Sequence, residues 1–320
     1  MFAPFTIPQV LHAARDRCGD ALAIEDGTGS TELTYRQVID CAEQRSRSLA
    51  VRIPVGQRIA VMMDAGVDLS LWILAVMWRH TVVPLRPESS DDEIERYLTL
   101  TRTRVVLASH LSDRLRRICR DLDLNVFPAE HLEGPQSFES SDATSTPSSD
   151  SIAVVLLTSG STGAPKVVPL THRNLLTSTR DMARSLELSS TDRTLVLWSP
   201  YHIGGLIDSL LVPLSTGGTI INGGRFTAEA MVALIDPARP TWTQFVPTTL
   251  DETIRYSERH DRPLAPNSLR FIRSVAAPIP EDLSALARKI SSFNLIARLI
   301  GPRGERPLSM LWRCELGLLG

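Results

Sequence analysis

The chain has 320 residues, of which 43% are hydrophobic and 22% are charged, and its formal net charge is -2. This length and composition allow a substantial buried core, in one large domain or in two lobes. Basic and acidic residues nearly balance, with a pI near 6.4, so the chain lacks the positive field that nucleic-acid binding requires, and we expect no nucleic-acid partner.

The first third of the chain alternates apolar runs with helix signals. Thr34 with Gln37, and Ser90 with Glu93, form capping boxes that predict two helix starts. Apolar runs at 58–63 and 104–108 predict buried strands. The run at 69–78 is strongly apolar but shorter than the about 20 residues needed to cross a bilayer, so it predicts a buried helix and no membrane association.

A change of composition separates two parts of the chain. Residues 134–151 are rich in Ser, Thr, Asp and Pro and contain almost no apolar side chains, which predicts a disordered surface linker. We therefore predict a first α/β lobe at 1–133 and a second at 152–300, followed by an atypical tail at 301–320.

The loop after an apolar run at 152–157 is the most informative stretch of the chain. It has the sequence Thr-Ser-Gly-Ser-Thr-Gly-Ala-Pro-Lys and ends at Lys166. Its glycines allow backbone amides to approach an anion, its hydroxyls donate hydrogen bonds, and its lysine supplies positive charge. The candidate phosphate-binding residues are Thr158, Ser159, Gly160, Ser161, Thr162, Gly163 and Lys166.

Two observations bear on this loop. Ala164 and Pro165 separate Gly163 from the lysine, so the spacing differs from that of the common P-loop of kinases and GTPases. Only two of the 34 basic residues are lysines, which indicates that the ammonium group at 166 is selected. The competing interpretation is an ordinary Ser/Gly turn between two strands.

The second part of the chain repeats strand and helix units. Thr171 predicts the capped start of a helix in which His172 and Asn174 are mainly structural. We predict that Asp208 is a solvated or capping carboxylate. The other interpretation is an acid that holds the α-amino group of an amino acid. The units predict an α/β fold of parallel sheets flanked by helices. The further strands are predicted at 195–198, 219–222, 241–246 and 269–273, and the further helices at 228–235, 248–258 and 281–290.

The loop and its continuation, Val-Val-Pro-Leu-Thr-His-Arg-Asn at 167–174, closely resemble the signature of the adenylate-forming superfamily. This superfamily comprises acyl-CoA synthetases, nonribosomal peptide adenylation domains and luciferases, and the chain is most similar to oxalate CoA ligase-like acyl-CoA synthetases. The resemblance implies the large N-terminal domain of that fold, with parallel and mixed sheets flanked by helices. Further matches in the family's order lie at 33–35, 58–61, 82–85, 200–205, 217–219, 246–248 and 273–278.

The resemblance implies a two-step reaction. A small carboxylic acid attacks the α-phosphate of ATP, giving an acyl-adenylate and pyrophosphate, and coenzyme A then takes the acyl group. Lys166 and the loop stabilise the departing phosphates. His202 lines the acyl pocket, and Ala276 and Ala277 form a turn against adenine and the acyl chain. The structural alternatives are that His202 is a core histidine whose hydrogen bonds are all made within the protein, and that Ala276 and Ala277 are small residues that pack at a strand end.

The chain departs from the family at 301–307, where Gly-Pro-Arg-Gly-Glu-Arg-Pro replaces the expected Tyr-Gly-x-Thr-Glu turn. The family's Mg²⁺ ligand motif and small C-terminal domain are missing, and the tail resembles a shifted reading frame or a retained intron. We therefore predict little or no turnover from the chain alone.

Three functional hypotheses stay open. The first is an acyl-CoA synthetase impaired by truncation. The second is a noncatalytic ATP- or acyl-binding remnant, or a partner of an intact paralogue, in a homo- or hetero-oligomer. The third is a nonribosomal-type amino-acid adenylation domain.

The cysteines and the two ends of the chain bear on its location. The four cysteines are widely spaced, which favours reduced thiols in an intracellular compartment. The N-terminus shows no secretory signal, and the C-terminal Gly-Leu-Leu-Gly is not a peroxisomal address. We expect a cytoplasmic location, with the peroxisome as the alternative.

Overall fold

The computed structural model describes residues 5–132, 147–158, 165–198, 200–262 and 268–277, together with residues 280, 281 and 283. Four predictions lie wholly or largely outside these residues: most of the linker at 134–151, the loop residues 159–164, the helix at 281–290 and the tail at 301–320.

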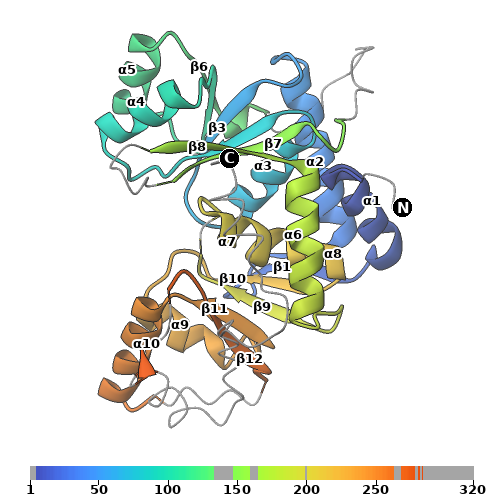
Figure 1. The fold of residues 1–320 in the computed structure, drawn as a ribbon, viewed down its shortest axis with the longest axis vertical. Helices are drawn as coiled ribbons and strands as arrows, with labels where there is room; N and C mark the ends of the chain where they lie inside the picture. The colour runs from blue at the N-terminus through green and yellow to red at the C-terminus, as the bar shows by residue number, and fades with distance from the viewer. Residues whose placement is uncertain are drawn as a thin grey trace, which may run out of the picture.

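The described residues form two six-stranded mixed sheets flanked by helices (Figure 1). The first, which we call the β7 sheet, contains in spatial order β6 (Asn125–Pro128), β5 (Val105–Ala108), β3 (Arg58–Met62), β4 (Thr81–Pro84), β7 (Ile152–Thr158) and β8 (Lys166–Thr171). The second, the β9 sheet, contains β12 (Phe271–Ser274), β11 (Trp242–Phe245), β9 (Arg193–Val196), β10 (Thr219–Asn222), β1 (Leu22–Asp26) and β2 (Glu32–Thr34). The predicted α/β class is confirmed.

Most neighbouring strands are parallel, and the antiparallel pairs are β1 with β2 and β7 with β8. The helices are α1 (Ile7–Cys18), α2 (Tyr35–Ala50), α3 (Val67–Met77), α4 (Asp91–Leu100), α5 (Asp113–Asp121), α6 (His172–Ser185), α7 (Ile203–Leu206), α8 (Val212–Thr216), α9 (Ala228–Ile235) and α10 (Pro247–Arg259), with a 3-10 turn η1 (Ala129–Leu132) and a π-helical turn η3 (Ile207–Leu211).

Each sheet takes strands from both the 1–133 and the 152–300 parts of the chain, and the predicted division into two lobes stays a prediction. Strands β1 and β2 lie in the β9 sheet, because β1 pairs in parallel with β10. The hairpin of β7 and β8 lies in the β7 sheet, because β7 pairs in parallel with β4. Helix α6 then carries the chain from β8 to β9 and so links the two sheets (Figure 1).

The predicted helix starts are confirmed. Thr34 and Ser90 accept hydrogen bonds from the backbone amides of Gln37 and Glu93, whose side chains accept from the cap amides in return. Thr171 and Asn174 form the same reciprocal box at the start of α6. These pairs act within four residues, which is why the sequence shows them.

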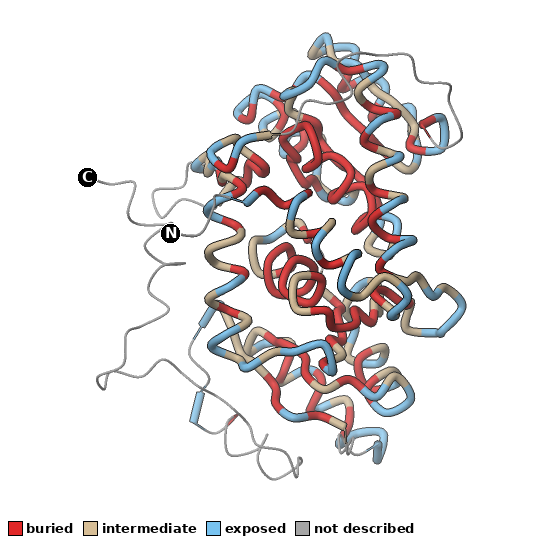
Figure 2. Tube along the Cα trace, turned by 90° about the vertical axis from the view of Figure 1, so that its right-hand side faces the viewer, coloured by how far each residue is buried: buried red, intermediate tan, exposed pale blue. Residues whose placement is uncertain are grey.

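The core lies where helices cover the sheets. Residues Leu69–Met77 of α3 are all buried, as the apolar run predicts. Figure 2 shows that buried residues gather inside the molecule, while exposed residues lie mostly along its outside. In the described part of the chain, no helix is long and apolar enough to span a membrane.

His172 is a structural residue, as predicted. It is 1% exposed at the start of α6, and its Nδ1 accepts a hydrogen bond from the Ile7 backbone amide at 3.2 Å. This bond connects α6 to the start of α1, an element that the sequence analysis did not predict. Cys18, Cys41 and Cys119 form no disulfide in the described part of the chain. Cys314 lies outside the described residues.

Tyr35 supports the junction of α2 with the turn between α8 and β10. Its side chain is fully buried, and its hydroxyl lies 2.7 Å from the carbonyl oxygen of Gly218 and 3.1 Å from that of Pro213. Tyr35→Phe should lower the free energy of unfolding by about 1–2 kcal/mol, because a buried carbonyl loses its donor. Urea unfolding would measure this, and an unchanged midpoint would contradict it.

Acid should destabilise the fold through His172 and His80. Burial lowers the pKa of each to about 4, whereas the unfolded value is about 6.5. Below pH 6.5 the unfolded chain binds protons that the folded chain does not, so stability falls as the pH drops towards 4, by about 1.4 kcal/mol per pH unit for each histidine. Unfolding curves at pH 5, 6 and 7 should show a shallower decline for His172→Gln than for the wild type, and equal slopes would count against this account.

Candidate active site

The carboxyl ends of the two sheets face each other. The Tyr201 hydroxyl, after β9, donates to the backbone carbonyl of Met63, after β3. Arg86, after β4, contacts Nε2 of His202. Arg225 and Glu88 form a third link, with 3.5 Å between Nη1 and Oε1. The crevice at the carboxyl ends of parallel strands is where ligands bind in open α/β sheets, so these loops define the candidate site.

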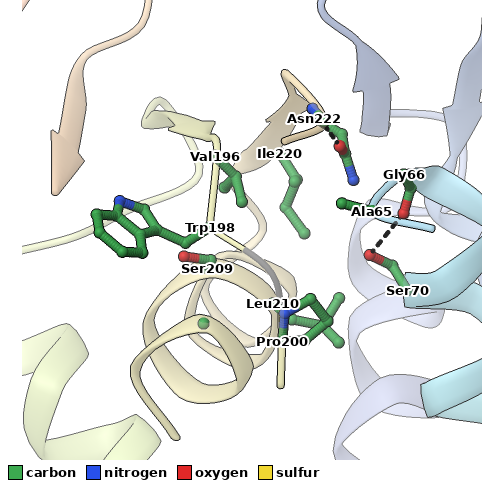
Figure 3. A pocket seen from close by; sticks show the side chains of 12 residues that line it. Ala65, Gly66, Ser70, Val196, Trp198, Pro200, Ser209, Leu210, Ile220 and Asn222 are labelled. Carbon is green, nitrogen blue, oxygen red and sulfur yellow. Dashed lines mark hydrogen bonds between the residues drawn. The ribbon is translucent and has the colours of Figure 1, made fainter. Parts of the chain in front are cut away.

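A small pocket lies at this junction (Figure 3). Ala65, Gly66 and Ser70, at the start of α3, approach it from one side. Residues on β9 and β10, after their ends, and on the helical run between the two strands form the other side. They include Val196, Trp198, Ser209, Leu210, Ile220 and Asn222.

The β7–β8 hairpin carries the predicted phosphate-binding loop. Thr158 and Lys166 are register partners at its open end, and the loop residues between 159 and 164 lie outside the described residues. Thr158 is half-buried and Lys166 is exposed. The apolar run that predicted the strand is β7, and a second strand follows the loop directly, which places the lysine at the base of the loop.

The hairpin reaches the same edge as Arg86. Val82 and Val154 are paired in register on the parallel strands β4 and β7. Arg86 and Thr158 each lie four residues beyond that pair (82 to 86 and 154 to 158). Thr158 and Lys166 therefore lie at the carboxyl end of β4 and β7, the same end of the β7 sheet from which Arg86 contacts His202.

His202 is exposed at the start of α7 and does not lie in the core. Although the residue is exposed, protein atoms around the ring partly desolvate it, and this desolvation together with the adjacent Arg86 guanidinium lowers the pKa of His202, since both disfavour the imidazolium. Arginine has only donors, so Nε2 of His202 accepts from Arg86 and the proton of the neutral ring resides on Nδ1. The site thus presents a neutral imidazole beside a permanent cation.

Ala276 and Ala277 form a tight, exposed turn after β12. Ala276 has φ +70°, and the Ala277 amide donates to the Val275 carbonyl at 2.9 Å. A positive φ is uncommon and costly for a residue with a Cβ, although five other non-glycine residues in the described part of the chain also adopt one. The described geometry is compatible with the predicted contact to a nucleotide, which stays a prediction.

The prediction of a solvated or capping Asp208 is wrong. Asp208 is 3% exposed on η3, and Arg273 at the end of β12 donates to its Oδ2. Arg273 also donates to Oε1 of Gln244 at 3.2 Å. Burial raises the pKa of Asp208, and Arg273 partly opposes that shift. Spacing along the chain did not show this pair because its members lie 65 residues apart.

The sequence analysis also missed Arg86 and Gln244. Arg86 directly follows the strand match at 82–85, and Gln244 lies two residues before the match at 246–248. Both positions follow from the rule that side chains at the carboxyl ends of parallel strands converge. That signal was present, but it needs the strand order to show which ends meet.

The described residues include no group of three or more His, Cys, Asp or Glu side chains that could hold a metal ion. We therefore assign no step to Mg²⁺ from these residues.

Comparison with known proteins gives consistent results. A family model described as AMP-binding enzyme matches residues 11–301. Sulfoacetate–CoA ligase of Cupriavidus necator is 30% identical over 266 residues, covering 78% of this chain and 50% of that protein. Oxalate–CoA ligase of Arabidopsis thaliana is 29% identical over 276 residues, covering 81% of this chain and 54% of that protein.

Solved structures share the fold. The O-succinylbenzoate coenzyme A synthetase of Bacillus subtilis, in complex with AMP, superposes with a TM-score of 0.76 at 21% identity, covering 89% of this chain and 71% of that structure. By comparison, the chain spans about half the length of the two curated CoA ligases named in the preceding paragraph.

The turn after β12 should respond to glycine in opposite ways at its two alanines. Ala276→Gly should raise the free energy of unfolding by up to about 1 kcal/mol, because glycine adopts a positive φ without strain. Ala277→Gly removes the same methyl group from an exposed residue and should lower it by about 0.5–1 kcal/mol through chain entropy. Denaturant unfolding measures both, and a loss of stability in Ala276→Gly equal to that in Ala277→Gly would refute the assigned strain.

Proposed function

The chain belongs to the AMP-binding enzyme family, and from that premise we propose that it binds ATP and a small carboxylic acid for adenylation of the acid and transfer of the acyl group to coenzyme A. One observation carries the proposal. Thr158 and Lys166 of the hairpin lie at the same end of the β7 sheet as Arg86, and Arg86 contacts His202 across the junction of the sheets. A phosphate-binding element and an acyl-side histidine are thereby brought to one crevice.

Lys166 is suited to hold the triphosphate. It is the exposed cation at the base of a loop rich in glycines and hydroxyls. When the carboxylate attacks the α-phosphate, the α–β bridging bond breaks and negative charge increases on the departing pyrophosphate. An ammonium group and hydroxyls already in place stabilise that charge more than they stabilise bound ATP, which lowers the barrier.

Arg86 and His202 are suited to the carboxylate of the acid. The guanidinium attracts and orients the anion, and the neutral ring occupies one arginine donor. A neutral ring avoids a second positive charge beside Arg86. It also leaves no imidazolium proton on Nε2 that could bind the nucleophilic oxygen of the carboxylate. Coenzyme A enters only as the acceptor in the second step.

Substitution of Lys166 tests the nucleotide site. Lys166→Ala should weaken ATP binding at least tenfold, which corresponds to about 1.4 kcal/mol, measured by isothermal titration calorimetry. Lys166→Arg should retain part of the affinity, because it keeps the charge but not the shape of the ammonium group. Lys289→Ala, which removes the other lysine of the chain, is the control and should bind ATP like the wild type. Folded wild-type protein that gives no heat with ATP would refute the proposal.

Pyrophosphate release separates catalysis from binding alone. Wild-type protein with ATP, Mg²⁺ and a panel of small carboxylic acids should release pyrophosphate slowly or not at all, and any release should vanish in Lys166→Ala. ATP binding without release would support the noncatalytic hypothesis. Release that depends on an amino acid would support the third hypothesis, since nonribosomal peptide synthetases also occur among the relatives.

A further inference from the structure

A buried ion pair adjoins the candidate site and has no part in the mechanism above. Asp208 on η3 is 3% exposed and accepts from Arg273 at the end of β12. The side chain of Arg273 retains 17% exposure, while that of Asp208 retains 4%. The acid therefore lies behind the arginine, and the arginine is the member that solvent or a ligand can reach.

The pair lies between the two segments that the sequence analysis assigned to the acyl side. Gln244 and Arg273 are register partners on β11 and β12, so their side chains share one face of the β9 sheet. The open side of Gly204 faces this group, since a Cβ placed there would lie 3.6 Å from Oδ2 of Asp208 and 3.7 Å from Nε2 of Gln244. Gly204 belongs to the segment after His202, and Arg273 lies three residues before Ala276.

A purely structural role does not account for the pair. Asp208 Oδ1 is buried and has no hydrogen-bond partner. Asp192, directly before β9, is equally buried, at 3% exposure, yet both of its oxygens are bonded. They accept from the Ser189 amide at 2.8 Å, from the Thr241 hydroxyl at 2.7 Å and from Arg270. A buried polar atom without a partner is destabilising, and replacing a whole buried ion pair by well-packed apolar residues is often neutral or stabilising, so stability alone gives little reason for this pair.

We propose that Asp208 is a specificity-determining residue that cancels the charge of Arg273, so that the acyl pocket accepts monocarboxylic acids with an uncharged chain. This inference rests on the proposed function. An uncompensated Arg273 would attract a second carboxylate or a sulfonate on the acid, whereas the neutral pair gives such a group no charge to offset the loss of its hydration. Arg273 still offers donors to an uncharged polar chain.

Nonhydrolysable acyl-sulfamoyl-adenosines provide the probes, because they carry the acyl group and adenosine in one molecule. Butanoyl, 3-hydroxypropanoyl and malonyl versions have chains of similar size that end in a methyl, a hydroxyl and a carboxylate. Titration calorimetry on the 320-residue chain should show that the methyl or hydroxyl probe binds at least tenfold more tightly than the malonyl probe.

Two variants assign this preference to Asp208. Asp208→Asn removes the compensating charge at nearly constant volume, and should shift the ratio of affinities by at least tenfold towards the malonyl probe. Asp208→Asn combined with Arg273→Gln removes both charges and should restore the wild-type ratio. Asp192→Asn breaks the other buried Asp–Arg pair and should lower stability without changing the ratio.

The outcomes separate this inference from the function on which it rests. If no probe binds to folded wild-type protein, the proposed function fails and the inference fails with it. If the probes bind but malonyl binds as tightly as the uncharged ones, only the inference is overturned. Should Asp208→Asn not fold, the double variant and the wild-type ranking still decide, because a malonyl preference in either one contradicts the assignment.

Discussion

The contact between the carboxyl ends of the two sheets is the constraint on which the candidate site depends. It arises because the chain exchanges strands: β1 pairs with β10, and the β7–β8 hairpin pairs with β4. Each sheet is thus completed by a distant part of the chain, and α6 connects them. Loops that leave β3, β4, β9 and β10 can then meet only at one junction, where Tyr201 and Arg86 make their contacts across it.

The charged groups at this junction follow a common principle. Asp208 lies where burial penalises its charge, whereas Arg86 and His202 are exposed, and each cation has a partner that changes what a ligand meets. Desolvation of the ring and the neighbouring Arg86 lower the pKa of His202, and in our proposal Asp208 cancels the charge of Arg273. Because the effective dielectric constant near buried groups is well below that of water, one added or removed charge has a large effect on an anionic acid. The pocket's charge is therefore a property of pairs of residues, and no single side chain determines it.

The β7–β8 hairpin holds the ends of the loop that we propose binds phosphate. The antiparallel register of β7 and β8 sets Thr158 opposite Lys166, and the buried strand β7 anchors both to the sheet. Family membership and the shared fold agree with this arrangement. The tight turn at Ala276 retains a strained residue at the end of β12, and strain of this kind persists only where the surrounding structure imposes it.

Short-range patterns in the amino-acid sequence were enough to predict the local features of the fold. The capping boxes at Thr34, Ser90 and Thr171, the buried helix α3 and most strands within one or two residues follow from patterns that act over a few positions. The sequence also predicted Lys166, and the resemblance predicted His202 and the alanine turn, as site residues, and these remain predictions. Long-range packing determines which strands share a sheet, that Arg86 contacts His202, and that Asp208 is buried against Arg273. These contacts join residues 65 and 116 positions apart, and their existence depends on strand order, which no local pattern encodes.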